Sequence, residues 1–560
     1  MNYSEYMNNI DMFLNDIRIN VSDERKVDLL ISLLIGSIND INKVGKDIPE
    51  TLLDKVKHKI VLFDGMQSRF IYEKVDNDLI KIQGLAGTGK TELLLHKLRE
   101  TYVNEKESRV VFTCHNKVLA EDMRNRIPKF FNFMKVQEQI EWDKRLWVFS
   151  SWGSQSSRNS GMYSYICNFY NLEFRRYSYN NSFDNVCKLA LEELKAREEV
   201  SKCFDYVFID ESQDFSENFV ELCRFVTSRK VYLAGDIFQN IFDNKVNEAV
   251  NCDYLLNKCY RTDPRTLMFA HSVGMGLYEV PVIRWLEDIG WKSCGYEYER
   301  NTCQEMILTR TPIRRFEDLE SAGISSITLK DTSEDMITQR ILECIEEIRK
   351  NNTTVKAEDI AVIFTSNTKV NYKIADELVY LLDEKYNWDS CRGYITKTKI
   401  NNAVFISNTN NVKGLEFPFV ICVETGRITR DINQRNSIYM ILTRSFLNSY
   451  FIVNSINTDF IEIYKGAIES INKNGFLKLR EPNEEEKKKQ AENVRIAANA
   501  QRKSVEDMIN EVCIKYPQLT NEQKHDLYQF IPKHIKDKVL DEQKIKDKTE
   551  KMIALMISED

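Results

Sequence analysis

The feature that most constrains this chain is the stretch IKIQGLAGTGKTELLLHKL at residues 80–98. Its first residues form a short apolar run typical of a buried strand, and its last residues have the leucine-rich pattern of a helix. Between them, GLAGTGKT fits the pattern G-x-x-x-x-G-K-[ST]. A strand, a glycine-rich loop and a helix in this order predict a phosphate-binding P-loop.

The chemistry of a P-loop gives each part of this stretch a role. Glycines let successive backbone N–H groups converge on phosphate oxygens beside the positive N-terminus of the following helix. We expect Lys90 to reach the β- and γ-phosphates and the Thr91 hydroxyl to ligate Mg²⁺. The predicted nucleotide-binding residues of the loop are Gly84, Leu85, Ala86, Gly87, Thr88, Gly89, Lys90 and Thr91. The alternative is an ordinary glycine-rich turn with a solvated lysine, and a P-loop alone does not separate kinases, GTPases, transporters and motors.

Length and composition bound the class of protein. A chain of 560 residues exceeds one hydrophobic core and indicates roughly two to four domains. We find no apolar run long enough to span a bilayer and no signal-peptide pattern at the N-terminus. Thirteen cysteines without a C-x-x-C pair and only six histidines argue against a zinc or iron–sulfur site and favour a reducing cytoplasm. The net charge of −7 neither indicates nor excludes a nucleic-acid partner.

Short apolar strands alternate with helical stretches in two blocks of the chain, which indicates parallel α/β sheets. The expected domains are a first block at 59–275 with an insertion at about 151–202, a connecting segment at 276–324, and a second block at 325–455. Residues 1–58 and 456–560 have helical patterns, and the EEEKKK run of the latter indicates a solvated helix face. We therefore predict an α/β protein with helical N- and C-terminal extensions.

The segment YVFIDESQDF places Asp210 and Glu211 at the end of an apolar strand. A P-loop needs a second carboxylate for its metal, and a strand end in a parallel sheet supplies one at the correct edge. We expect Asp210 to hold Mg²⁺ and Glu211 to orient and deprotonate the attacking water, which indicates hydrolysis. The alternative is a strand that simply ends in surface acids.

A further strand, in VYLAGDIFQNIF, ends with Asp236 and Gln239. A glutamine at this edge can sense the γ-phosphate by hydrogen bonding and so distinguish ATP from ADP. Gln239 alone would indicate nothing. Its position in the sequence after the strand that ends in Asp210 and Glu211 favours this role.

Six motifs in order resemble those of superfamily 1 helicases of the UvrD, Rep and PcrA type: GLAGTGKTE, FIDESQD, LAGDIFQNIF, CYRTDP, NVKGLEF and ILTRS. The resemblance covers about residues 60–455. It implies two RecA-like domains, with ATP in the cleft between them and single-stranded DNA across their top. The spans 151–202 and 262–412 leave little room for the accessory subdomains of the family, so the chain resembles a compact member.

The resemblance also assigns ATP-site roles outside the P-loop. In FDGMQ, Gln67 matches the glutamine that reads adenine, and in CYRT, Tyr260 matches the residue that stacks on it while Arg261 contacts the γ-phosphate. In KGLEF, Glu416 matches a residue on the ribose side. Arg444 of LTRS resembles the arginine finger from the opposite domain, whose contribution to the rate can be ~10³–10⁵. Hydrolysis would then be coupled to closure of the cleft. For either arginine alone, a surface salt bridge is the alternative.

The nucleic-acid contacts that the resemblance implies are Thr113, Asn116, Lys117, Phe149, Trp152 and Phe242. Stacking of a base on an aromatic ring is typically worth ~1–3 kcal/mol. The sequence departs from the family at Asn244, where a tryptophan is usual, at Lys245 in place of an arginine, and at Asn410 in place of a histidine. For the aromatic residues, packing in the core is the alternative.

The motifs predict an ATP- and Mg²⁺-dependent enzyme, and the resemblance implies a translocase or helicase with the family's 3′-to-5′ polarity on single-stranded DNA, with RNA left open. The alternative is a nucleotide-gated, DNA-sensing ATPase subunit of a nuclease-containing repair or phage-defence complex, which would not unwind processively. Such a subunit would have a protein partner such as a nuclease. An inactive scaffold is a third possibility, and the intact ATP-site residues argue against it.

Overall fold

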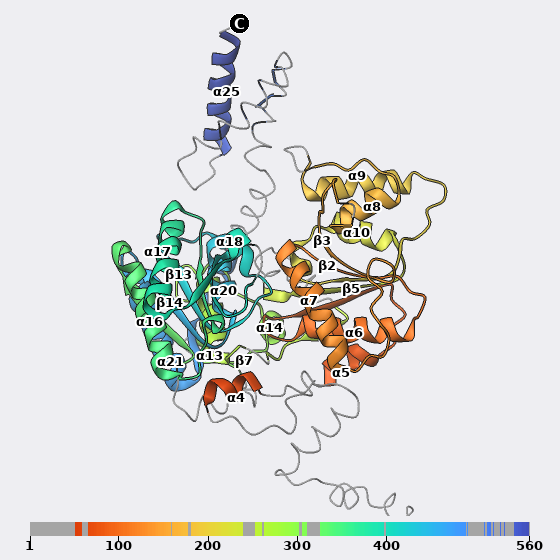
Figure 1. The fold of residues 1–560 in the computed structure, drawn as a ribbon. Helices are drawn as coiled ribbons and strands as arrows, with labels where there is room; N and C mark the ends of the chain where they lie inside the picture. Colours follow the sequence, from red (N-terminus) through yellow and green to blue (C-terminus); the bar gives the residue numbers. More distant parts are fainter. Residues whose placement is uncertain are drawn as a thin grey trace, which may run out of the picture. The chain divides into compact units, whose positions relative to one another are not determined.

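The computed structural model describes residues 51–58, 65–157, 159–176, 181–238, 252–259, 262–301, 305–310, 325–396, 399–488 and 542–558, together with residue 490 and scattered positions between 509 and 531. The chain divides into two compact units, one formed by residues 1–176 and 183–481 and the other by residues 177–182 and 482–560. The larger unit contains both α/β blocks (Figure 1).

The first block folds into a parallel sheet of six strands in the order β3-β2-β4-β5-β1-β6. Its strands are β1 (Leu79–Gly84), β2 (Val110–Cys114), β3 (Leu146–Ser150), β4 (Phe204–Ile209), β5 (Thr227–Asp236) and β6 (Tyr254–Leu256). The inner strands β2 and β4 are buried on both faces, which explains their continuous apolar sequences. This sheet and its helices are called the first lobe.

Helices cover both faces of this sheet, and each face has its own core. One core contains side chains of α5 (Gly65–Tyr72), α6 (Lys90–Asn104) and α7 (Lys117–Phe133). The other contains side chains of α8 (Met162–Phe169), α9 (Phe183–Lys195) and α10 (Glu217–Phe225). The expected insertion at 151–202 therefore supplies α8 and α9, and its aromatic side chains pack on the sheet.

The second block also folds into a six-stranded parallel sheet, in the order β11-β12-β10-β13-β14-β9. Its strands are β9 (Ile327–Thr332), β10 (Ile360–Phe364), β11 (Asp389–Arg392), β12 (Ala403–Asn408), β13 (Phe417–Glu424) and β14 (Ser445–Asn454). Helices α16 (Ile337–Asn351) and α17 (Lys369–Tyr386) pack on one face, and α13 (Pro264–Met275), α20 (Ile432–Leu442) and α21 (Thr458–Asn474) pack on the other. This second lobe confirms the predicted α/β class with two parallel sheets.

The two lobes share part of one hydrophobic core. Leu85 of the P-loop and Ile237 and Phe238, which follow β5, lie in the same buried cluster as α13 and α20. Since buried apolar side chains must pack closely, the P-loop and the end of β5 are in contact with the second lobe rather than separated from it by solvent.

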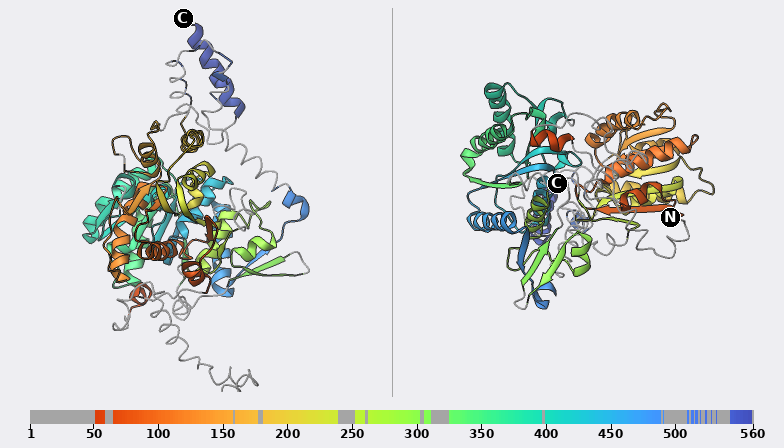
Figure 2. Two further views of the ribbon diagram at one scale, coloured as in Figure 1. Left: turned by 90° about the vertical axis from the view of Figure 1, so that its right-hand side faces the viewer. Right: turned by 90° about the horizontal axis from the view of Figure 1, so that it is seen from below.

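A third, antiparallel sheet has the strand order β15-β8-β7. It joins β7 (Glu297–Arg300) and β8 (Glu305–Thr309) to β15 (Phe476–Arg480), which follows α21. Figure 2 shows the green strands of this sheet beside the blue strand from the later part of the chain. The segment expected only to connect the two blocks thus contains two strands and the short helix α14 (Asp288–Ser293).

The first described helix, α4 (Leu52–His58), belongs to the core of the second lobe although it precedes the first lobe in sequence. Leu53 and Val56 are buried there among side chains of α16 and β10. Lys57 Nζ lies 2.6 Å from Asp359 Oδ2. The chain therefore crosses from the second lobe to the first between α4 and α5.

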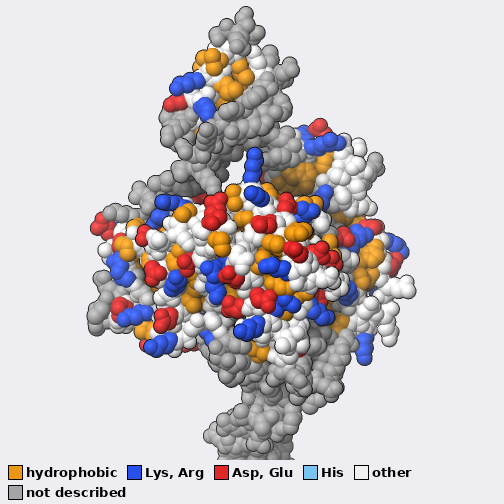
Figure 3. All heavy atoms as spheres, turned by 60° about the vertical axis from the view of Figure 1, so that its left-hand side comes forward, with side chains coloured by type: hydrophobic (Ala, Val, Ile, Leu, Met, Phe, Trp, Pro, Cys, Tyr) orange, Lys and Arg blue, Asp and Glu red, His pale blue; other side chains and the backbone are white. Residues whose placement is uncertain are grey.

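The smaller unit contributes α25 (Glu542–Ser558), whose Ile545 and Ile553 are buried in a small apolar cluster. On the face in Figure 3, blue and red side chains alternate over the larger unit without a field of one sign. Within the described ranges, every helix is too short or too polar to span a bilayer.

Candidate nucleotide site

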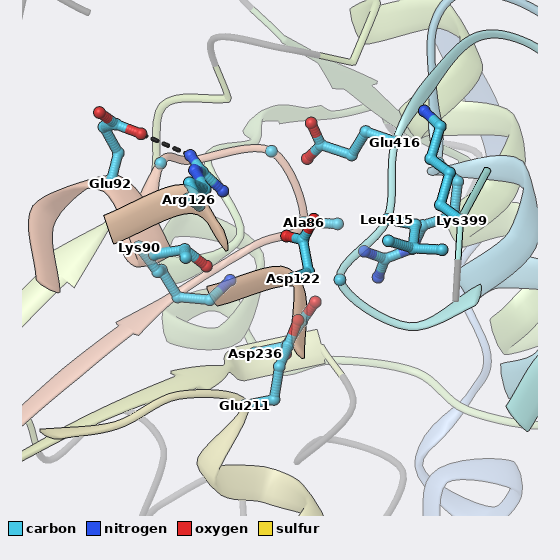
Figure 4. Close-up of a pocket in the computed structure, with 15 residues that line it drawn as sticks. Ala86, Lys90, Glu92, Asp122, Arg126, Glu211, Asp236, Lys399, Leu415 and Glu416 are labelled. Carbon is cyan, nitrogen blue, oxygen red and sulfur yellow. Dashed lines mark hydrogen bonds and ion pairs between the residues drawn. The ribbon is translucent and has the colours of Figure 1, made fainter. Parts of the chain in front are cut away.

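A cavity of about 320 Å³ lies where the P-loop faces the second lobe (Figure 4). Its lining from the first lobe consists of Ala86, Gly87, Gly89, Lys90, Thr91, Glu92, Asp122, Arg126, Glu211 and Asp236. The second lobe contributes Lys399, Gly414, Leu415, Glu416 and Arg444. The structure therefore brings the P-loop, the acidic strand end, the KGLEF motif and the LTRS arginine to one cavity.

The P-loop has the geometry that its glycines allow. Gly87 and Gly89 have φ angles of 77° and 86°, values that favour glycine, and α6 begins directly afterwards at Lys90. The Lys90 ammonium lies over the loop and donates to the carbonyl oxygens of Gly84 and Leu85, both at 2.9 Å. A phosphate oxygen is a stronger acceptor than a carbonyl, so Lys90 is placed to exchange these bonds for contacts with a bound polyphosphate.

Gln67 lies against the P-loop from α5. Its side chain is 1% exposed, and its Nε2 donates to the backbone oxygen of Thr88 at 2.9 Å. The Thr88 hydroxyl donates in turn to Leu85 O at 2.9 Å. The glutamine predicted to read the base is therefore fixed to the loop predicted to hold the phosphates.

Thr91 and Asp210 are adjacent, as a shared Mg²⁺ site requires. The Thr91 hydroxyl donates to Asp210 Oδ2 at 2.7 Å. Burial and the neighbouring Glu211 raise the pKa of Asp210 to about 6. The raised pKa shows that this buried site disfavours the ionised carboxylate, which a bound cation would stabilise, and both groups are hard oxygen ligands. The residues present therefore fit Mg²⁺.

Glu211 is held by backbone and side-chain contacts. Its φ of 52° is in the left-handed region, which is uncommon for glutamate and often marks a functional position. Gln213 Nε2 donates to Glu211 Oε2 at 2.7 Å. Burial acts to raise the pKa of Glu211, but the charges of Lys90 and Arg444 and the bond from Gln213 outweigh it, so this pKa is lowered. The carboxylate is thus ionised and able to accept a proton.

Arg444 reaches the pocket from the second lobe, where it follows α20 and precedes β14. Its side chain is buried, and its Nε donates to Met440 O at 3.2 Å. Its positive charge also acts to lower the pKa of Asp236, which burial raises overall. An arginine on one lobe therefore acts electrostatically on carboxyl groups of the other, which is the arrangement expected of an arginine finger.

Sequence reasoning did not single out four charged residues of this cavity. Glu92 and Arg126 form an ion pair at 2.6 Å between α6 and α7, drawn as a dashed line in Figure 4. Asp122 lies one helical turn before Arg126, and Lys399 faces them from the second lobe. The four-residue spacing of Asp122 and Arg126 places both on one face of a helix, but no sequence signal shows that this face borders the nucleotide.

The lobes also meet beside the pocket. Lys413 of the second lobe forms an ion pair with Asp214, which follows the acidic strand end of the first. A Cβ atom on Gly414 would lie 2.2 Å from Leu119 Cδ2 of α7. These contacts describe closely apposed lobes.

The described residues among those predicted to contact nucleic acid lie near the ends of β2 and β3, and their exposure differs. Lys117 is exposed at the start of α7, and Asn116 caps this helix by accepting from Leu119 N at 2.8 Å. Thr113 is buried, and its hydroxyl has no hydrogen-bond partner among the described residues. Phe149 lies opposite Thr113 in the sheet.

The two described aromatic residues of this set pack within the protein. Phe149 is 1% exposed, and its ring lies 5.3 Å from that of Tyr165. The ring of Trp152 is half-buried, 5.1 Å from that of Phe183. The predicted base contact of Phe149 is thus replaced by packing in the core, the alternative interpretation, because the insertion supplies apolar partners for its ring.

Four predicted site residues lie outside the described part of the chain: Gln239, Phe242, Tyr260 and Arg261. The structure places their neighbours, since Phe238 ends the described segment after β5 and Thr262 begins the next one. Asn244 and Lys245 also lie outside it.

The arrangement is a P-loop that faces a second α/β lobe across one cavity. Residues 67–244 match the family model of the AAA domain, and residues 403–452 match that of the UvrD-like helicase C-terminal domain. With the six ordered motifs, these two matched segments make the chain similar to the UvrD-like superfamily 1 helicases. No curated protein sequence matches it.

Solved structures give more distant likenesses. Two are of the DUF1998 helicase MrfA, one bound to DNA and one bound to DNA and AMPPNP, each with 12% identity and a TM-score of 0.38. They cover 81% and 76% of this chain, which spans only 59% and 54% of theirs. The S. cerevisiae Dbp5 structure, bound to RNA and ADP BeF3, has 12% identity and a TM-score of 0.37, covering 72% of this chain and 88% of that one. The similarity to UvrD-like helicases rests on the two matched segments and not on these structures.

Proposed function

We propose that this chain hydrolyses ATP in the cavity between its lobes and uses the resulting lobe movement to translocate 3′ to 5′ along single-stranded DNA. The observation that supports this most is that Lys90 and Glu211 of the first lobe and Arg444 of the second line one cavity. A motor needs such a divided site, because only then does the state of the nucleotide change how the lobes attract each other.

The placement of the side chains supports the following roles in hydrolysis. Lys90 and the P-loop amides bind the phosphates of ATP, and Gln67 approaches the base from the loop side. Glu211, ionised and oriented by Gln213, accepts the proton of the attacking water. Arg444 stabilises the negative charge that develops on the γ-phosphate. Glu416 lies on the same wall, where it can contact the ribose.

Thr91 and Asp210 would hold Mg²⁺, which when bound neutralises phosphate charge. We assign γ-phosphate sensing to Gln239 and Arg261, and adenine stacking to Tyr260, by the resemblance of their motifs. Lys117, Asn116 and Trp152, with Phe242, are the proposed DNA contacts on the first lobe. Thr113 would act through its backbone, since its side chain is buried.

ATPase assays with matched variants test the proposal. Lys90→Ala and Glu211→Gln should each lower kcat at least ~100-fold while the far-ultraviolet circular dichroism is unchanged. Lys106→Ala removes an exposed lysine outside the motifs and should have wild-type activity. Undiminished turnover by Glu211→Gln would overturn the role of Glu211. Failure of the wild-type protein to bind ATP in calorimetry would overturn the proposal as a whole.

The nucleic-acid substrate needs a separate measurement. The ATPase rate should rise with single-stranded DNA more than with RNA or blunt duplex, and the stimulation should weaken as salt increases. Strand displacement should require a 3′ single-stranded tail. A requirement for a 5′ tail would reverse the polarity, and preferential stimulation by RNA would change the substrate.

The second candidate is the nucleotide-gated, DNA-sensing ATPase subunit of a larger nuclease-containing complex. It is favoured by the burial of Phe149 and the packing of Trp152 on Phe183, which leave fewer aromatic rings to grip a strand. DNA-stimulated ATPase activity without displacement or translocation would support this candidate over the motor.

A further inference from the structure

An aromatic cluster joins the two lobes directly behind the nucleotide cavity. Phe238, which follows β5 in the first lobe, has its ring 4.1 Å from that of His271 on α13, at an angle of 17°. The same ring lies 4.2 Å from that of Tyr439 on α20 of the second lobe, at 36°. All three side chains are fully buried. Rings stacked at these distances move together, because separating them would open a cavity.

Hydrogen bonds continue from this cluster to Glu211. The backbone N–H of Phe238 donates to Asp236 Oδ1 at 2.9 Å. The backbone N–H of Asp236 donates to Gln213 Oε1 at 2.9 Å, and Gln213 Nε2 donates to Glu211 Oε2 at 2.7 Å. A single amide side chain thus connects the end of β5 to the carboxylate at the end of β4.

The other end of the path reaches the arginine finger. Tyr439 lies in α20, and Arg444 follows the last residue of this helix, Leu442, after Thr443. Because a helix is stiff over this length, a displacement of α20 moves Tyr439 and Arg444 together. The contact between the rings of Tyr439 and Phe238 therefore couples the position of Arg444 in the second lobe to the end of β5 in the first.

Resting on the proposed function, we propose that Tyr439 and Gln213 are positioning residues of the ATPase reaction. Contact of the Tyr439 ring with Phe238 fixes the end of β5, and Gln213 transmits this position to Glu211. The carboxylate is thereby oriented toward the attacking water when α20 has brought Arg444 to the cavity. Hydrolysis then depends on the position of α20 at the cavity as well as on the binding of ATP to the P-loop.

A purely structural role would predict a different behaviour. The Tyr439 hydroxyl is buried and has no hydrogen-bond partner among the described residues, so the tyrosine is not retained there for a polar bond within them. What it supplies is its ring, which contacts the rings of both Phe238 and His271. Loss of that ring should weaken the orientation of Glu211, 2.7 Å from Gln213, without touching Lys90 or the P-loop.

A double-mutant cycle tests the proposal with saturating ATP and single-stranded DNA. Tyr439→Leu and Gln213→Ala should each lower kcat at least ~10-fold while KM for ATP changes less than ~3-fold. The double variant should be no more than ~3-fold slower than the worse single variant, because both changes interrupt one path. Tyr439→Phe, which keeps the ring, should recover most of the rate.

The matched control is Tyr450→Leu, which removes a buried tyrosine of the second lobe on the opposite face of its sheet. Thermal unfolding should show a comparable loss of stability for Tyr439→Leu and Tyr450→Leu, but only the former should lose kcat. If Tyr439→Leu does not fold, Phe238→Leu takes its place in the cycle under the same criteria.

Two outcomes would overturn the path. One is that the two substitutions act independently, so that the fold decrease in kcat of the double variant equals the product of the decreases in the two single variants. The other is an equal loss of kcat in Tyr450→Leu. If the wild-type protein hydrolyses ATP and Tyr439→Leu matches it, the path fails alone, whereas an inactive wild-type protein contradicts the proposed function instead.

Discussion

Lys413 and Asp214 form an ion pair between the lobes, linking the KGLEF motif to the residues that follow Asp210 and Glu211. Their side chains are 26% and 11% exposed, so the pair is partly screened by water. We expect Lys413→Ala to lower kcat/KM for ATP about two- to fivefold, the size of a partly exposed pair. The charge-reversed variant Lys413→Asp with Asp214→Lys should recover part of the loss, and the difference should shrink at high salt. Equal losses at all salt concentrations would argue against an electrostatic role.

Gly414 is predicted to be intolerant of a side chain. Its φ is 73°, and an added Cβ would lie 2.2 Å from Leu119 Cδ2 in the other lobe. We expect Gly414→Ala to lower kcat/KM at least ~10-fold, because it forces the lobes apart as well as straining the backbone by about 1–2 kcal/mol. Gly475→Ala is the control, since Gly475 has a φ of 71° but nothing within 4 Å of a Cβ. Both variants should lose similar stability in urea unfolding, and only the first should lose activity.

Arg435 is fully buried and joins three helices of the second lobe. It pairs with Glu279 at 2.6 Å and donates to the Tyr464 hydroxyl at 2.7 Å. Arg435→Met leaves Glu279 short of a partner in a site where burial already raises its pKa. We expect a loss of about 3–5 kcal/mol in the free energy of unfolding. Adding Glu279→Leu should recover part of it, and a double variant less stable than Arg435→Met would contradict this account.

The free energy of unfolding should fall in acid because of His96. Burial lowers the pKa of His96 to about 4, so between pH 4 and 6.5 the folded state binds fewer protons than the unfolded state. Stability is therefore fully present above about pH 6.5 and decreases by up to about 3 kcal/mol as the pH falls to 4. Denaturant unfolding from pH 7 to 4.5 should show a shallower decline for His96→Leu than for the wild type. Parallel curves for the two proteins would remove His96 as the cause.

The nucleotide half of the site could be predicted because its residues follow local patterns. A P-loop is specified by eight consecutive residues, and carboxylates at the end of an apolar strand are brought beside it by the parallel sheet itself. Arg444 could be placed only through the order of motifs, since nothing local shows that residues so far apart share a cavity.

Other features depend on packing between segments distant in sequence. The sequence motif predicts a base contact for Phe149, but the exposure of this side chain depends on where the aromatic residues of the insertion pack. Tyr439 has no sequence signal, because its importance comes from the ring it meets in the other lobe. The docking of α4 on the second lobe was not expected either, since its apolar residues fit any helix.

The docking of α4 on the second lobe limits how far the two lobes can move apart. Helix α4 is held by Leu53, Val56 and the pair of Lys57 with Asp359, and α5 carries Gln67 against the P-loop. Only residues 59–64 join the two helices, a length that reaches at most about 25 Å when fully stretched. As long as α4 stays bound to the second lobe, the length of this connection limits how far the two lobes can separate. A larger separation requires α4 to dissociate from the second lobe first.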